Sequence, residues 1–128
     1  MRLLLDTHVL IWALIEPDRL APPLRTVLED PAQEVLFSAA SVWEIAIKAA
    51  LGRADFKVAP GEILSAALET GFVELPVRAA AALAVADLPM HHRDPFDRLL
   101  VAQALTEPAR LYTADAALEP YSELVVRV

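Results

Sequence analysis

The chain has 128 residues, of which 56% are hydrophobic, and its formal net charge at pH 7 is -7. One domain of this length buries about two-thirds of the surface of its unfolded chain, so we expect a single domain over residues 1–128. The absence of cysteine excludes a disulfide scaffold, a thiolate zinc site and a cysteine nucleophile. The acidic balance argues against a broad basic surface for nucleic acid.

The apolar runs of the chain are short. Asp6 interrupts the first run after Leu3–Leu5, which is too short for a secretory signal. Val9–Ile15 and all later runs fall well below the roughly 20 apolar residues of a membrane-spanning helix. We therefore expect a cytoplasmic protein without a membrane partner.

Short apolar runs alternate with longer stretches rich in Ala and Leu. The runs predict strands and the stretches predict helices. This alternation is typical of an α/β fold with a parallel sheet covered by helices on both faces. Ligands bind such sheets at the carboxyl ends of the strands, near a switch in strand order. In chain order we expect a strand over Arg2–Leu5, helices over His8–Leu14 and Pro22–Leu28, a strand over Val35–Phe37, helices over Val42–Leu51 and Gly61–Thr70, a strand over Phe72–Leu75, helices over Arg78–Ala86 and Pro95–Leu105, and strands over Leu111–Thr113 and Leu124–Val128.

Four acidic residues stand out by their position relative to these elements. Asp6, Glu44 and Asp115 each lie at or just after the carboxyl end of a predicted strand, and Asp97 opens a helix that leads into one. Because the carboxyl ends of parallel strands meet at one edge of a sheet, we expect the four side chains to converge there.

Each of these acids also has an ordinary structural role available. Asp6 suits a helix N-cap, which contributes about 1 kcal/mol. Glu44 completes a capping box that begins at Ser41. Asp97 falls in a first helical turn, where a carboxylate offsets the helix dipole, and Asp115 could cap a short turn. Taken singly, each position leaves open both a structural role and a role in a functional site. Only the convergence of the four acids at one edge of the sheet favours a functional site.

A cluster of ionised carboxylates repels itself unless a proton or a cation compensates the charge. Mg²⁺ and Mn²⁺ prefer oxygen ligands, so the four acids are candidates both for metal binding and for catalysis. Two such ions about 4 Å apart activate water and stabilise the leaving oxygen in phosphodiester cleavage. The acids therefore predict metal-dependent hydrolysis of a phosphate ester.

Four segments that carry these acids follow one another almost from end to end of the chain. They are LLLDTHVLIW at 3–12, SAASVWEIAIK at 38–48, HRDPFDRLLVAQA at 92–104 and TAD at 113–115. With them the chain resembles the PIN-domain family, and specifically the VapC-type toxins of bacterial toxin–antitoxin pairs. The resemblance implies a three-layer α/β/α sandwich around a short parallel sheet. It matches Asp6, Glu44 and Asp97 to the core acids of the family and Asp115 to its more variable fourth acid.

The resemblance also implies an activity and its partners. The activity is Mg²⁺- or Mn²⁺-dependent endoribonuclease cleavage of an RNA such as tRNA, rRNA or mRNA. The partners are a second copy of the chain in a homodimer and an antitoxin. No segment of this sequence resembles a built-in antitoxin, so the antitoxin is expected to be a separate chain.

Several residues near the acids are candidates for contacts with substrate. The Thr7 hydroxyl could orient Asp6 or a metal-bound water, or simply begin a helix. The basic residues Lys48, Arg53, Arg93 and Arg98 lie on the segments that carry Glu44 and Asp97 and could bind RNA phosphates. Lys48 could instead form an i,i+4 ion pair with Glu44, and Arg98 could simply neutralise the charge of the adjacent Asp97.

Histidine and tryptophan give weaker signals. The adjacent His91 and His92 favour a surface loop over contact with phosphate or proton transfer near neutral pH. Trp12 and Trp43 lie among apolar helical residues, which favours the core or a dimer interface over base stacking.

Two other functional classes remain open on the same residues. One is a metal-dependent DNA nuclease or phosphatase. Phosphatases that form a phospho-aspartate usually need a second acid close behind the first, whereas Thr7 and His8 follow Asp6. The other is a non-catalytic protein-binding module on the same scaffold, which the presence of all four acids disfavours.

Overall fold

Five parallel strands run through the middle of the computed structural model, which describes residues 2–128. Neighbouring strands pair in the order β3-β2-β1-β4-β5, and every pair is parallel. This confirms the predicted α/β class with a short parallel sheet. The strands are β1 (Leu3–Leu5), β2 (Val35–Ser38), β3 (Val73–Leu75), β4 (Arg110–Thr113) and β5 (Val125–Arg127).

Helices connect the strands at the positions expected from the sequence. Within residues 2–128, no helix is long and apolar enough to cross a bilayer. The helix predicted over Arg78–Ala86 divides into α5 and a 3-10 turn, η3 (Val85–Asp87). The α-helices are α1 (Thr7–Ile15), α2 (Pro22–Glu29), α3 (Ala39–Ala50), α4 (Pro60–Thr70), α5 (Ala79–Ala84) and α6 (Pro95–Thr106), and the other 3-10 turns are η1 (Pro17–Arg19), η2 (Ala54–Phe56) and η4 (Ala116–Tyr121).

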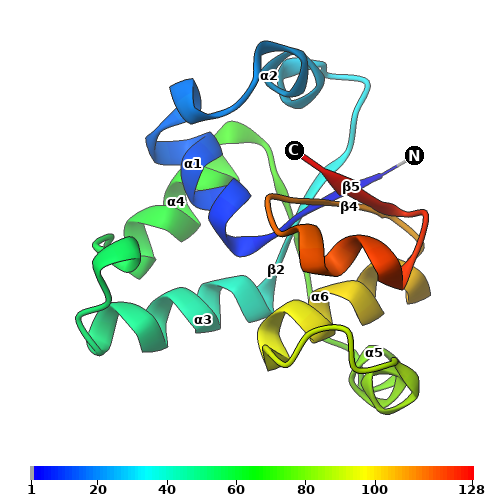
Figure 1. Ribbon diagram of the computed structural model, residues 1–128. Coiled ribbons are helices and arrows are strands. Elements are labelled where there is room, and N and C mark those ends of the chain that lie inside the picture. The colour runs from blue at the N-terminus through cyan, green and yellow to red at the C-terminus, as the bar shows by residue number, and fades with distance from the viewer. Residues whose placement is uncertain (1) are drawn as a thin grey trace.

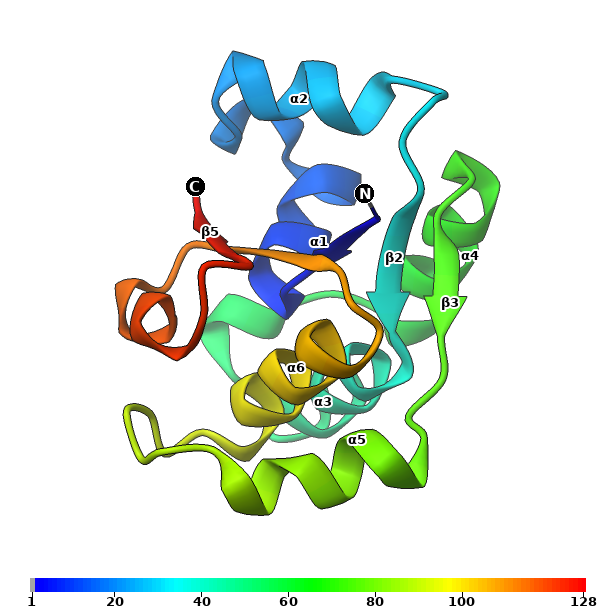
Figure 2. The ribbon, with the colours of Figure 1, turned by 90° about the vertical axis from the view of Figure 1, so that its right-hand side faces the viewer.

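The sheet has a hydrophobic core on each face because side chains alternate along its strands. Leu3 and Leu5 of β1 pack with residues of α1, α2, α3 and α4, whereas Leu4 packs on the other face with residues of α6 and η4. In Figure 1, α1 and α4 lie to the left of the strands and α5 and α6 to the lower right. Figure 2 shows α5 next to α6, on the side away from α2. The chain therefore forms three layers, with the sheet in the middle.

The strand order places a topological switch beside β1. From β1 the chain proceeds outward to β2 and β3, then crosses back to β4 on the other side of β1. Loops that leave β1 and β4 at such a switch diverge and leave a crevice between them. The fold thus marks the carboxyl ends of β1 and β4 as the place for a ligand.

The start of α3 differs from the sequence prediction. The helix begins at Ala39 rather than Val42, because the Ser38 hydroxyl accepts the Ala40 N–H at 3.0 Å and caps the helix. The prediction of a capping box at Ser41 was therefore wrong, and Ser41 lies inside the helix. The Ser38 hydroxyl also donates to Gln103 Oε1 at 2.6 Å, which ties the end of β2 to α6.

The two-sided core makes a prediction about stability. Phe37 of β2 is completely buried, so Phe37→Ala should lower the free energy of unfolding by about 3–5 kcal/mol through lost burial and a cavity. Urea denaturation followed by circular dichroism measures this loss. Leu83→Ala is the control, since Leu83 is 75% exposed. Equal losses in the two variants would contradict the described core.

Candidate active site

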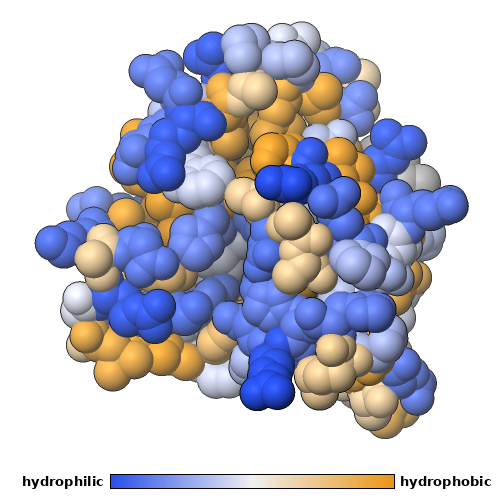
Figure 3. Space-filling view, viewed as in Figure 1, coloured by the Kyte–Doolittle hydropathy of each residue, from blue (hydrophilic) through white to orange (hydrophobic). Residues whose placement is uncertain are grey.

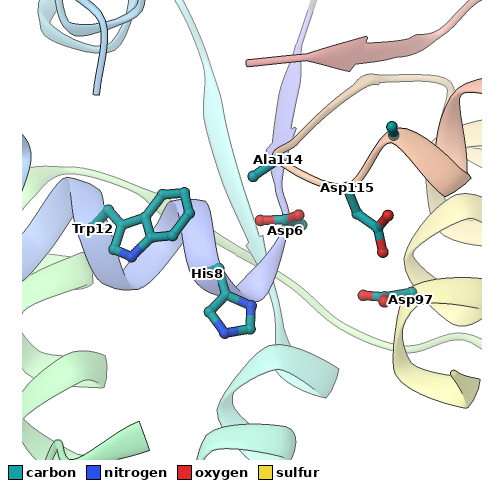
Figure 4. Close-up of a pocket in the computed structure, with 7 residues that line it drawn as sticks. Asp6, His8, Trp12, Asp97, Ala114 and Asp115 are labelled. Carbon is teal, nitrogen blue, oxygen red and sulfur yellow. The ribbon is translucent and has the colours of Figure 1, made fainter. Parts of the chain in front are cut away.

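A pocket of about 410 Å³ opens at the carboxyl ends of β1 and β4. Asp6, Asp97 and Asp115 line it, so three of the four singled-out acids share one cavity (Figure 4). In Figure 4 the carboxylates of Asp97 and Asp115 face each other, and Asp6 lies beside them at the end of β1. His8, Trp12, Ala114 and Ala116 complete the lining.

Asp6 follows β1 directly and is fixed by two hydrogen bonds. Its Oδ1 accepts the Val9 N–H at 2.8 Å, which caps α1, and its Oδ2 accepts the Thr113 hydroxyl of β4 at 2.5 Å. Asp6 is 5% exposed, and burial raises the pKa of its carboxyl above the ordinary value against the effect of these hydrogen bonds. The helix cap expected as an alternative is therefore present, and the same carboxylate lines the pocket.

Asp97 lies among other negatively charged groups at the edge of the pocket. It lies in the first turn of α6, whose N-cap Asp94 accepts the N–H groups of Phe96 and Asp97. Burial, followed by the negative charges of Asp94, Asp6 and Glu44, raises the pKa of Asp97 to about 7. The carboxylates of Asp94, Asp6 and Glu44 thus lie close enough to Asp97 to affect its pKa.

Asp115 divides its two oxygens between the fold and the pocket. Oδ1 accepts the Ala117 N–H at 2.9 Å and caps η4, whereas Oδ2 accepts a hydrogen bond from His92 Nε2 at 2.8 Å. Burial raises the pKa of Asp115, but these two hydrogen bonds outweigh it, so the net pKa lies below the ordinary value.

Glu44 lies on α3 outside the pocket lining, 3% exposed. The Thr7 hydroxyl donates to its Oε1 at 2.6 Å, and Lys48 Nζ donates to its Oε2 at 2.5 Å. Thr7 therefore orients Glu44 rather than Asp6, and the expected i,i+4 pair of Glu44 with Lys48 is confirmed.

The predicted phosphate-binding residues occupy two kinds of environment. Lys48 is largely buried, with its Nζ 5.0 Å from the Phe56 ring centre and 3.9 Å from Asp94 Oδ2. Arg53 and Arg93 are exposed and accessible to a ligand.

Arg98 has a structural role instead. It is 8% exposed, and its guanidinium donates to the main-chain oxygens of Val85 and Pro89, each at 3.1 Å. The prediction that Arg98 binds phosphate therefore does not fit its position, because its donors hold the loop that precedes α6.

His92 is the residue that the sequence analysis misplaced. It was expected on a surface loop, yet its Nε2 lies 2.8 Å from Asp115 Oδ2 and 3.4 Å from Asp97 Oδ2. His91 is exposed and packs edge-on against Tyr121, as a surface residue would. In the sequence, His92 differs from His91 only in lying one residue closer to the helix-capping Asp94. That difference does not predict which of the two histidines contacts the acids.

The residues of this pocket fit a divalent cation. Its acids offer carboxylate oxygens, the ligands that Mg²⁺ and Mn²⁺ prefer. Burial and the neighbouring negative charges raise the pKa of Asp97, and a bound cation would offset both effects. His92, Asp97 and Asp115 each offer one possible ligand atom, and these three atoms lie within 4.8 Å of one another.

The surface around the pocket is polar, with apolar residues at one side. Figure 3 shows hydrophilic residues across the middle of this face and hydrophobic ones at its lower left, over the end of α3. Trp43 of α3 is 60% exposed, and Leu51, the C-cap of this helix, is 72% exposed. Trp43 is therefore not a core residue, while Trp12 is partly buried against Arg19.

Comparison with known proteins assigns the class that this fold and acidic pocket define. The PIN domain model matches residues 3–124, and the chain belongs to the PIN domain family. A chain of VapBC2 from Rickettsia felis, crystallised with a DNA fragment from its promoter, has a TM-score of 0.72 and 15% identity, covering 100% of this chain and 98% of that one. A chain of FitAcB from Neisseria gonorrhoeae has a TM-score of 0.55 and 25% identity, and the match covers 90% of this chain and 88% of that one. The search of curated proteins gave no match.

The raised pKa of Asp97 predicts how stability depends on pH. Between its ordinary value of 3.8 and about 7 the folded protein binds more protons than the unfolded chain, so metal-free stability falls as pH rises through this range. Asp97→Asn has no such titration, so the variant should melt at a higher temperature than the wild type at pH 8, and the difference should shrink toward pH 4.

Thermal unfolding in EDTA from pH 4 to 8 measures this difference. Asp87→Asn is the control, because Asp87 is exposed on η3. Melting curves of Asp97→Asn that follow the wild type at every pH would contradict the charge imbalance.

Proposed function

We propose that this protein is a metal-dependent endoribonuclease of the VapC toxin type that hydrolyses RNA phosphodiester bonds. The observation that carries the proposal is the gathering of Asp6, Asp97 and Asp115 in one pocket at the β1–β4 switch, with Glu44 close enough to raise the pKa of Asp97. Membership of the PIN domain family supports hydrolysis by a nuclease mechanism.

The four acids are the proposed metal ligands and catalytic groups. Asp6, Asp97 and Asp115 offer oxygens from the pocket lining, and Glu44 adds charge from α3. A bound Mg²⁺ or Mn²⁺ supplies Lewis acidity toward a phosphate oxygen and offsets the developing negative charge.

The other residues of the site hold these acids in place or face the substrate. Thr113 fixes Asp6 in the pocket lining, and Thr7 and Lys48 fix Glu44 on α3, so both carboxylates have little freedom to turn. Arg53 and Arg93 are the proposed phosphate contacts, because both are exposed and can offset the acidic total charge where RNA approaches.

We also propose that a separate antitoxin covers the site. The likeness to a VapBC2 chain supports such a partner. A second cavity of about 230 Å³ shares His8 and Trp12 with the acidic pocket and extends along α1 past Ile11 and Ile15. This surface is mixed in polarity, because Ile11 and Ile15 line it together with Asp55 and Lys57, which suits a peptide segment with both apolar and charged side chains.

The remaining parts of the proposal are a homodimer and a cytoplasmic location. The exposed apolar residues Trp43 and Ile47 of α3 and its C-cap residue Leu51 are spaced four residues apart and so lie on one side of this helix. This face is the proposed contact between two copies of the chain.

Removing one charge from the acid cluster should abolish RNA cleavage and keep the fold. Asp6→Asn and Glu44→Gln preserve shape, but each loses a carboxylate needed to hold the cation. Cleavage should fall by at least about 100-fold, because several kcal/mol of transition-state stabilisation depends on the cation. A gel assay on total RNA with Mg²⁺ or Mn²⁺ measures the loss, and circular dichroism checks the fold.

Glu123→Gln is the matched control, since Glu123 is exposed at the far end of the chain. Single-stranded DNA and a phosphomonoester are tested beside RNA. Unchanged RNA cleavage by both active-site variants would contradict the proposal, and faster cleavage of DNA than of RNA would contradict the substrate.

A further inference from the structure

The loop that carries His92 is held in place by side chains from two other elements. The main-chain N–H groups of His91 and His92 donate to the Tyr121 hydroxyl at 3.1 and 2.9 Å. Arg98 of α6 donates to the same hydroxyl at 3.2 Å and to the Pro89 carbonyl at 3.1 Å. The position of the His92 backbone is therefore set independently of the acids in the pocket.

The hydrogen bonds of the His92 ring assign its tautomer. The main-chain N–H of Asp94 donates to Nδ1 at 2.9 Å, so Nδ1 is an acceptor and carries no proton. The proton of the neutral ring then lies on Nε2, which donates to Asp115 Oδ2 at 2.8 Å. His92 thus presents an N–H group, not a lone pair, to the carboxylates.

This tautomer argues against the simplest interpretation of the cluster of His92, Asp97 and Asp115. A histidine ligand binds a metal through an unprotonated ring nitrogen and usually donates its other N–H to an acceptor. If Nε2 of His92 bound a metal, the proton would move to Nδ1 and point at the Asp94 N–H, which is a donor. Two donors would then face each other in a part-buried site, and the Asp94 N–H would lose its partner.

We propose that His92 is a positioning residue that acts through Asp115. Its Nε2–H holds the Asp115 carboxylate beside Asp97 and keeps its proton when a divalent cation binds, so that the cation takes only oxygen ligands in this pocket. The proposal rests on the metal site of the proposed function and adds a selective role for one of two adjacent histidines. Partners of this kind, which orient a ligand without touching the metal, typically change metal affinity by about 10- to 100-fold.

Manganese binding tests the positioning role. The full-length wild type, His92→Leu, His92→Gln and the control His91→Leu are titrated with Mn²⁺ at constant pH by calorimetry. His92→Leu should weaken binding by about 10- to 100-fold. His92→Gln should keep most of the affinity because the Gln amide offers an N–H donor with similar reach, and His91→Leu should match the wild type. Wild-type affinity in His92→Leu would overturn the proposal.

Spectroscopy separates a positioning residue from a metal ligand. In protein labelled with ¹⁵N-histidine, long-range ¹H–¹⁵N spectra should show His92 in the Nε2–H form both without metal and with saturating Mg²⁺. The His92→Gln variant identifies the signals. Loss of the Nε2 proton on adding Mg²⁺, or a directly coordinated nitrogen in pulsed electron paramagnetic resonance of the Mn²⁺ form, would overturn the proposal.

These measurements do not depend on RNA cleavage. A protein that gives the expected binding and spectra but cuts no RNA would contradict the proposed function and still support the role of His92. A wild type that binds no Mn²⁺ would contradict both.

Discussion

The crowding of carboxylates at the carboxyl ends of β1 and β4, with Asp6 buried and Asp97 partly buried, is the constraint on which the site depends. Like charges in a poorly solvated pocket are unfavourable unless a proton or a cation compensates them. The chain supplies part of this compensation, with Lys48 paired to Glu44 and an N–H of His92 donated to Asp115. Within residues 2–128 the Asp97 carboxylate accepts no side-chain hydrogen bond, although His92 Nε2 lies 3.4 Å from it, and burial with the neighbouring negative charges raises its pKa to about 7. The pocket is thus most favourable with a divalent cation.

The fold creates this crowding with ordinary structural devices. Asp6 and Asp115 each cap a helix with one oxygen, and Asp94 caps α6 so that Asp97 falls in its first turn. The parallel sheet then brings these helix starts together, because β1 and β4 are neighbours at the point where the strand order reverses. Capping a helix is therefore compatible with a place at the pocket, so the two interpretations that the sequence leaves open do not exclude each other.

The strands, helices and acidic edge could be predicted because short apolar runs and helix starts depend on local sequence. Other features depend on contacts between distant segments. The start of α3 required a choice between Ser38 and Ser41, and the contact of Ser38 with Gln103 of α6 is not visible locally. The place of His92 depends on Tyr121, 29 residues later, and the role of Arg98 depends on carbonyls that a loop turns toward it. Polar residues in loops were therefore the hardest to place.

The most direct test of the account is a crystal structure of the full chain with Mn²⁺, in which anomalous scattering locates the ion. We expect an anomalous peak in the pocket between Asp6, Asp97 and Asp115, with carboxylate oxygens around it. A pocket that stays without a peak at saturating Mn²⁺, or an ion bound elsewhere on the chain, would contradict the claim that this edge of the sheet is built for a metal.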